Sequence, residues 1–256
     1  MSALRTLYNR ALSEESRYWL YKLRYPGHFR HLRERVNQHA KGDFSIRPFS
    51  EKKAIFVHIT KAAGTSTALS LFGALPYHYT AWQYRVIFGR KAFNQYFKFT
   101  FVRNPWDRLY SAYSFLKNGG WDDQDRRWAE ENLSDTNDFN DFVLNWLTTE
   151  RLYSHIHFWP QSRFVLDHKG KLLVDYIGYF ETINEDFAVI ARRLNTEASL
   201  SHTNASPRKD YRSVYSAAAA QKVLELYRED VDLFGYEFDG IKQKCWAEIN
   251  NPGQGV

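Results

Sequence analysis

AIFVHITKAAGTSTALSL, residues 54–71, passes from an apolar run, through small and polar residues, to apolar residues at helical spacing, and this order decides the local fold. The apolar run 54–57 predicts a buried strand, because a strand covered on both faces is apolar throughout. The apolar positions that follow have helical spacing and predict the packing face of a helix: Ala68, Leu69, Leu71 and Phe72. The stretch therefore predicts a strand that runs through a short loop into a helix.

The loop itself has the composition of an anion site. Its small residues allow successive backbone N–H groups to converge on an anion, and the helix N-terminus adds positive potential. Gly64 is expected to allow the turn, Lys61 adds a full charge, and Thr65 and Ser66 offer hydroxyl donors. The alternative is an ordinary strand-to-helix turn capped by one of these two hydroxyls. A Walker A loop is excluded, because its lysine follows a glycine, whereas here Lys61 precedes Gly64.

A second strand-to-helix segment follows about forty residues later. In FKFTFVRNPWDRLYSAY, residues 97–113, aromatic residues alternate with others at the period of a strand, and Arg103 stands at its carboxyl end. Asn104 can cap a helix that begins with Pro105. Asp107, at the third helical position, could accept a hydrogen bond from the Asn104 N–H in return. The planar guanidinium of Arg103 suits a phosphate, and Ser111 offers a hydroxyl two turns further on. Arg103 as a surface ion-pair partner is the plainer alternative.

The two segments together resemble the sulfotransferases that use 3′-phosphoadenosine 5′-phosphosulfate (PAPS), and the resemblance extends over about residues 54–238. Phe-Val-Arg-Asn-Pro-Trp-Asp-Arg at 101–108 resembles the carbohydrate class of that superfamily, called family 2 or Golgi-type. The resemblance implies a 5′-phosphosulfate loop made of Lys61, Ala62, Ala63, Gly64, Thr65 and Ser66. It also implies a 3′-phosphate site at Arg103 and Ser111, and a lid in which Arg208 and Lys209 are possible contacts. An exposed basic loop is the alternative for that late segment.

The expected chemistry is in-line sulfuryl transfer to a hydroxyl of a carbohydrate or glycoconjugate, with adenosine 3′,5′-bisphosphate (PAP) as product and no metal. Lys61 is expected to stabilise the leaving oxygen, and His78 to act as general base, as a histidine in this interval does in the enzymes that the chain resembles. Glu181 is a second choice for the base, and it can instead cap the helix that it precedes. His58 is expected to be structural. His155 and His157 lack a third ligand at a telling spacing, so we expect no metal site.

Strands that alternate with helices predict a three-layer α/β sandwich around a parallel sheet. Further elements are expected at 82–96 (helix interrupted by Gly89), 121–135 (loop-rich, partly helical), from 136 (helix), 171–177 (strand), after 181 (helix) and around 223–227 (helix). We expect one domain over 1–256, with a helical N-terminal cover at 1–50 and a core at 54–238.

Composition narrows the remaining possibilities. A net charge of +6 and a pI near 9.2 fit a phosphorylated donor, whereas the mixing of acidic with basic residues argues against a nucleic-acid surface. Cys245 stands alone, so no intramolecular disulfide can form. No spanning stretch or signal peptide is evident, which predicts a cytoplasmic and bacterial protein. The alternatives to a sulfotransferase are a nucleotide kinase of related fold and a non-catalytic module that binds nucleotide or polyanion. The oligomeric state is left open.

Overall fold

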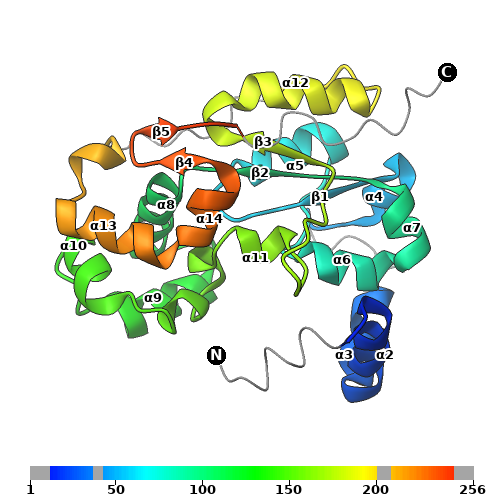
Figure 1. The fold of residues 1–256 in the computed structure, drawn as a ribbon, viewed down its shortest axis with the longest axis horizontal. Helices are drawn as coiled ribbons and strands as arrows, with labels where there is room; N and C mark the ends of the chain where they lie inside the picture. The colour runs from blue at the N-terminus through cyan, green and yellow to red at the C-terminus, as the bar shows by residue number, and fades with distance from the viewer. Residues whose placement is uncertain (1–11, 37–42, 201–208, 245–256) are drawn as a thin grey trace.

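The computed structural model describes residues 12–36, 43–200 and 209–244, and its centre is a parallel sheet (Figure 1). Among the described residues this sheet has the order β1 (Ala54–Val57), β2 (Phe97–Val102) and β3 (Tyr176–Tyr179). Ala54 lies opposite Phe97, and Phe99 lies opposite Tyr176. Every residue of β1 is buried, as a parallel strand covered on both faces requires. The carboxyl ends of the strands therefore meet at one edge.

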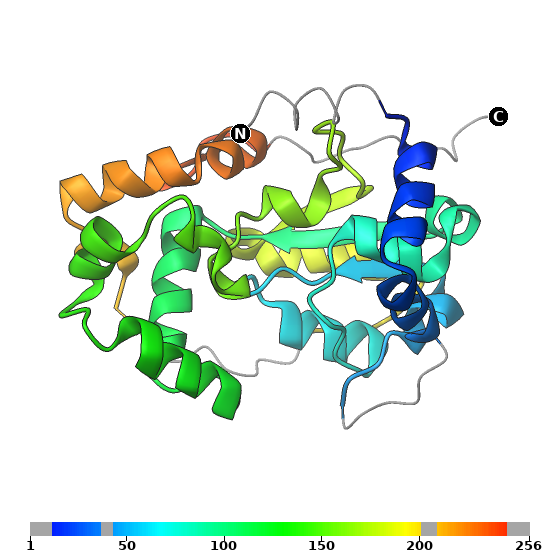
Figure 2. The same ribbon diagram turned by 90° about the horizontal axis from the view of Figure 1, so that it is seen from below.

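Helices cover both faces of the sheet. Helix α12 (Ile183–Arg193) lies along one face and α11 (Ser162–Val165) along the other, as the two views agree (Figures 1 and 2). The connections carry α5 (Gly64–Phe72) after β1, α6 (Ala81–Phe88) and α7 (Arg90–Gln95) before β2, and α8 (Pro105–Lys117) after it. This arrangement confirms the predicted α/β fold with a central parallel sheet. The interruption expected at Gly89 is also confirmed.

The other elements surround this centre. They are α2 (Glu14–Arg24), α3 (Pro26–Glu34), α4 (Arg47–Lys52), α9 (Asp123–Leu133), α10 (Phe139–Asp141), α13 (Ala217–Leu226), α14 (Arg228–Phe234), β4 (Tyr236–Glu237) and β5 (Gly240–Ile241). One hydrophobic cluster surrounds the sheet, and a second lies between α8, α9, α10 and α13.

Three sequence expectations need correction. The strand expected at 171–177 begins only at Tyr176, because Asp167 accepts the N–H groups of Lys169 and Lys171 and closes a turn there. Leu172 makes only an isolated bridge to Leu166. The segment 121–135, expected to be rich in loop, is mostly the helix α9. The helix expected from 136 begins at 139 and continues as a π-helix over 142–146.

The start of α8 confirms part of its predicted capping. The Asn104 side chain accepts the Trp106 N–H at 3.0 Å, and Pro105 is the first helical residue. Asp107 does not accept a hydrogen bond from the Asn104 N–H, because its carboxylate accepts from Arg103 Nε at 2.7 Å. The Asn104 N–H instead donates to Glu181 at 2.7 Å. The end of β3 therefore fixes the start of the helix that follows β2.

Candidate functional site

The loop between β1 and α5, residues 60–66, hereafter the Lys61 loop, leaves a helix N-terminus without a side-chain cap. Lys61 and Ala63 have left-handed backbone conformations, with φ of 64° and 59°. Ala63 is the N-cap residue, and no side chain accepts a hydrogen bond from the first turn of α5. Thr65 is exposed, and the Ser66 hydroxyl donates back to the Ala63 carbonyl at 3.3 Å. The capped-turn alternative is therefore wrong, and the first-turn N–H groups can receive an anion.

Gly64 has a different role from the one expected. Its φ is not positive, so the turn does not require a glycine there. A Cβ at Gly64 would lie 1.7 Å from the imidazole of His58. That ring is buried and stacks on Phe56, with 5.5 Å between centroids. The absence of a side chain at Gly64 therefore allows His58 to pack directly against the start of α5.

Arg103 joins the second segment to the Lys61 loop. Its Nη1 donates to the Lys61 carbonyl at 2.8 Å and its Nε to Asp107, and its guanidinium lies 4.2 Å from the centroid of Phe180. Gln161 holds the backbone of Arg103, accepting from its N–H at 2.9 Å and donating to its carbonyl at 2.8 Å. Only 4% of Arg103 is exposed, so the surface-partner alternative is wrong. These contacts fix the plane of the guanidinium beside the loop.

His78 lies on the other side of His58. Its Nδ1 donates to the His58 carbonyl at 3.1 Å, which leaves Nε2 as the ring's acceptor. Burial lowers the pKa of His78, and the positive charge of Lys61 acts in the same direction, while the His58 carbonyl and Asp125 raise it. The ring is therefore neutral at pH 7. The two imidazole centroids are 4.3 Å apart.

A chain of ring contacts leads from Lys61 to these histidines. Lys61 Nζ lies 3.8 Å from the centroid of Phe115 on α8, and Phe115 lies 5.0 Å from His157. His157 is 6.2 Å from His78. Burial lowers the pKa of His157 well below its ordinary value, and the neighbouring His155, His78 and Lys61 lower it further. This cluster places neutral imidazoles around the lysine.

Asp125 of α9 is the acidic neighbour of the cluster. Its carboxylate lies 3.3 Å from His155 Nε2 and 4.0 Å from His157 Nε2. It also accepts the Trp121 N–H at 2.8 Å. A Cβ at Gly120 would lie 2.1 Å from Asp125 Cβ, so the glycine turn before α9 packs closely on this residue. The sequence reasoning missed Asp125, although Asp122 as an N-cap residue could have shown the helix that carries it.

The other residues that the sequence predicts for the site are Ser111, Arg208, Lys209 and Glu181. Ser111 is half-buried on α8, one turn before Phe115 and on the same helix face. Lys209 is exposed, and Arg208 lies outside the described residues. Glu181 accepts from the Asn104 N–H and from the Tyr236 hydroxyl at 2.8 Å, and burial raises the pKa of its carboxyl. Glu181 therefore positions the start of α8.

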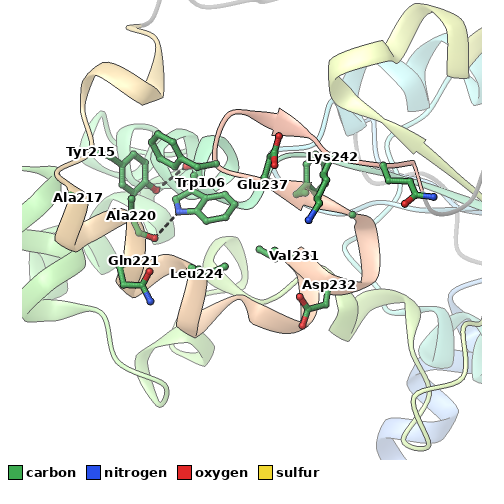
Figure 3. Close-up of a pocket in the computed structure, with 14 residues that line it drawn as sticks. Trp106, Tyr215, Ala217, Ala220, Gln221, Leu224, Val231, Asp232, Glu237 and Lys242 are labelled. Atoms are coloured by element: carbon green, nitrogen blue, oxygen red, sulfur yellow. Dashed lines mark hydrogen bonds between the residues drawn. The ribbon is translucent and has the colours of Figure 1, made fainter.

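A cavity of about 810 Å³ lies elsewhere, between α13, α14 and the β4–β5 hairpin (Figure 3). None of the predicted site residues that the structure describes lines it. Trp106 forms part of its wall and donates through its indole nitrogen to the Ala220 carbonyl at 2.9 Å. Among the described residues no cluster of histidine, cysteine and carboxylate side chains could hold a metal ion. Within the same ranges, no helix has the length and apolar character needed to span a bilayer.

Comparisons with known proteins agree with the sequence resemblance. Residues 79–237 match the sulfotransferase family. The chain is 32% identical over 136 residues to an uncharacterized protein of Archaeoglobus fulgidus, covering 52% of this chain and 98% of that protein. It is 27% identical over 171 residues to carbohydrate sulfotransferase 12 of Xenopus laevis, covering 56% of this chain and 40% of the frog protein. No solved structure matches the chain. Arg103 and Ser111 lie inside the family match, whereas Lys61 and His78 precede it.

Proposed function

Because this chain belongs to the sulfotransferase family, we propose that it transfers the sulfuryl group of PAPS to a hydroxyl of a carbohydrate or glycoconjugate. The carbohydrate acceptor is suggested by the name of the frog relative, carbohydrate sulfotransferase 12. The hydrogen bond from Arg103 Nη1 to the Lys61 carbonyl is the observation that carries the proposal, because it joins two anion-binding segments into one site. The two segments suit the two charged ends of a single donor molecule.

The Lys61 loop is the proposed holder of the 5′-phosphosulfate. The uncapped N–H groups of the first turn of α5 donate hydrogen bonds to the phosphate oxygens, and residues 62–66 contribute further backbone and hydroxyl donors. Lys61 neutralises the bridging oxygen as the S–O bond breaks. That charge appears only as the transition state forms, so Lys61 acts on turnover more than on donor binding.

The 3′-phosphate end of PAPS is assigned to Arg103. Its guanidinium, oriented by Asp107 and by the Lys61 carbonyl, is assigned the 3′-phosphate, and the Ser111 hydroxyl on α8 adds a further donor. Lys209, together with Arg208 outside the described residues, is a candidate for closing over this phosphate. The ordered plane of Arg103 favours binding, because little side-chain entropy remains to be lost.

His78 is the proposed general base. With Nδ1–H donating to the His58 carbonyl, Nε2 is available to take the proton of the acceptor hydroxyl. The acceptor oxygen forms a bond to sulfur, the bond from sulfur to the bridging phosphate oxygen breaks, and PAP leaves. Burial lowers the pKa of His78, which favours the neutral ring that can accept this proton at pH 7. Glu181 is a poor alternative, since its carboxylate already accepts from Asn104 and Tyr236.

The test is transfer of label from PAPS to a panel of saccharides, with and without EDTA, together with calorimetric binding of PAP. Lys61→Met should lose about 10²–10³-fold in kcat, and His78→Gln about 10²–10⁴-fold, while both still bind PAP. Lys52→Met, at an exposed lysine of α4, is the matched control and should keep full activity. Failure to bind PAP, or a requirement for Mg²⁺ and ATP, would overturn the proposal.

A further inference from the structure

Helix α2 has an apolar outer face that nothing in the described residues covers. Trp19, Leu20 and Leu23 of α2 are 53%, 39% and 72% exposed, and Tyr25, which directly follows the helix, is 53% exposed. They make up four of the nine large exposed hydrophobic side chains of the described residues, and all four fall within seven positions of the chain. Scattered single residues of this kind are ordinary on a protein surface, whereas a contiguous set marks an interaction site.

The same helix has a separate inner face that holds it to the protein. Tyr18 and Tyr21 pack on Phe29 of α3, with centroids 5.4 Å and 6.4 Å apart, and Tyr21 also packs edge-on against Trp82 of α6 at 4.7 Å. Trp19, Leu20 and Leu23 take no part in these ring contacts, whereas Tyr25 packs on Tyr21, with 5.7 Å between centroids. An amphipathic helix needs one apolar stripe, and α2 has a second.

Cations flank the outer stripe on both sides. At about 100° per residue, Lys22 and Arg24 fall on opposite sides of the stripe formed by Trp19, Leu20 and Leu23. Lys22 Nζ lies 4.9 Å from the Trp19 ring centroid, and the Arg24 guanidinium lies 5.6 Å from that of Tyr25. Among the described residues, neither cation forms an ion pair with a carboxylate. Aromatic and leucine side chains bordered by such cations are typical of helices that lie in a membrane interface.

The hairpin of α2 and α3 is fixed in place and stands at the margin of the molecule (Figures 1 and 2). Arg33 of α3 donates to the carbonyls of Ile87 at 3.0 Å and Val86 at 3.4 Å, at the end of α6. It approaches Gly89 so closely that a Cβ there would lie 2.9 Å from its Nη1. The hairpin also lies outside residues 79–237, which match the family. The outer face of α2 is therefore presented on a rigid support, separate from the family's shared region.

We propose that the outer face of α2 docks on an anionic lipid bilayer, with Trp19, Leu20 and Leu23 entering the interface. Lys22 and Arg24 then face the lipid headgroups. Self-association is disfavoured, because a symmetric contact would place the same cations of two copies against each other. The proposal is independent of sulfuryl transfer and concerns where the protein works.

The test is flotation of the full chain with phosphatidylcholine vesicles, made with and without phosphatidylserine. Binding is expected only with the anionic lipid and should weaken as salt is raised. Leu23→Glu should reduce binding at least tenfold, and Val189→Glu, at an exposed apolar residue of α12, should leave it unchanged. The double variant Lys22→Glu/Arg24→Glu should also lose at least tenfold.

Two further measurements make the result decisive. Arg192→Glu/Arg193→Glu, at two exposed arginines of α12 on the opposite side of the sheet from the hairpin (Figure 1), is the charge-matched control and should bind as the wild type does. Circular dichroism melts check that each variant is folded. Equal losses in control and hairpin variants would overturn the proposal, as would absence of flotation with anionic vesicles. A dimer that dissociates in Leu23→Glu, without lipid binding by the wild type, would overturn it in favour of a second copy.

Discussion

Replacing Gly64 by alanine tests how the His58 ring organises the site. The new Cβ would meet that ring at 1.7 Å, so the ring must retreat by about 1.7 Å to reach the 3.4 Å of ordinary contact. It is held between Phe56 at 5.5 Å and His78 at 4.3 Å, so neither side offers that space. We expect a loss of about 1–3 kcal/mol in the free energy of unfolding, the range for overpacked cores. The melting temperature should fall by about 2–4 °C for each kcal/mol.

The assay is a double-mutant cycle followed by urea denaturation. In a His58→Ala background the clash is absent, and Gly64 then behaves as an ordinary helical glycine. Alanine should there be neutral or stabilising by about 0.5–1 kcal/mol, so the sign of its effect should reverse. Gly27→Ala, at a helical glycine with no atom within 4 Å of the new Cβ, is the matched control and should not destabilise. An equal loss from Gly64→Ala in both backgrounds would refute the role given to His58.

The remaining predictions concern charged residues. Arg103→Lys should weaken PAP binding about tenfold by calorimetry, since lysine keeps the charge without the planar fork; unchanged affinity would count against the assignment. Asp125→Asn removes a negative charge that raises the pKa of His78, so the acidic limb of kcat/KM should move to lower pH, whereas Asp123→Asn should leave it in place. Arg108→Gln should cost about 3–5 kcal/mol in urea denaturation, because a nearby buried carboxylate loses its counter-charge, and a loss below 1 kcal/mol would contradict this.

Local signals were enough to predict the two strand-to-helix segments. The apolar run before Lys61 and the Asn104-Pro105 start of α8 act within a few residues, so the sequence states them directly. The role of Gly64 could not be predicted, because the approach of the His58 ring is a tertiary contact. The strand at 171–177 was misplaced for a related reason: a short apolar run has the same pattern in a hairpin as in a sheet.

Arg108 shows why a charged residue in a polar motif is hard to place from sequence. It is fully buried, and it donates to the carbonyls of His157 at 3.2 Å and Thr60 at 3.4 Å and to that of Trp159. From the sequence alone, a partnership with Asp107 or a neighbouring carboxylate is one interpretation of Arg108. The structure instead uses the several N–H donors of one guanidinium to join the Lys61 loop to the segment around Trp159.

Asp230 also holds the segment that Arg108 joins to the Lys61 loop. Its buried carboxylate accepts the N–H groups of Gln161 at 2.7 Å and Ser162 at 2.8 Å, at the start of α11. Burial raises the pKa of Asp230 and lowers that of Arg108, and each charge partly offsets the cost of burying the other. Together they fix the backbone on both sides of Pro160, which places the Gln161 amide against the backbone of Arg103. The orientation of the arginine proposed to bind the 3′-phosphate therefore depends on Arg108 and Asp230, two buried charged residues outside the proposed phosphate contacts.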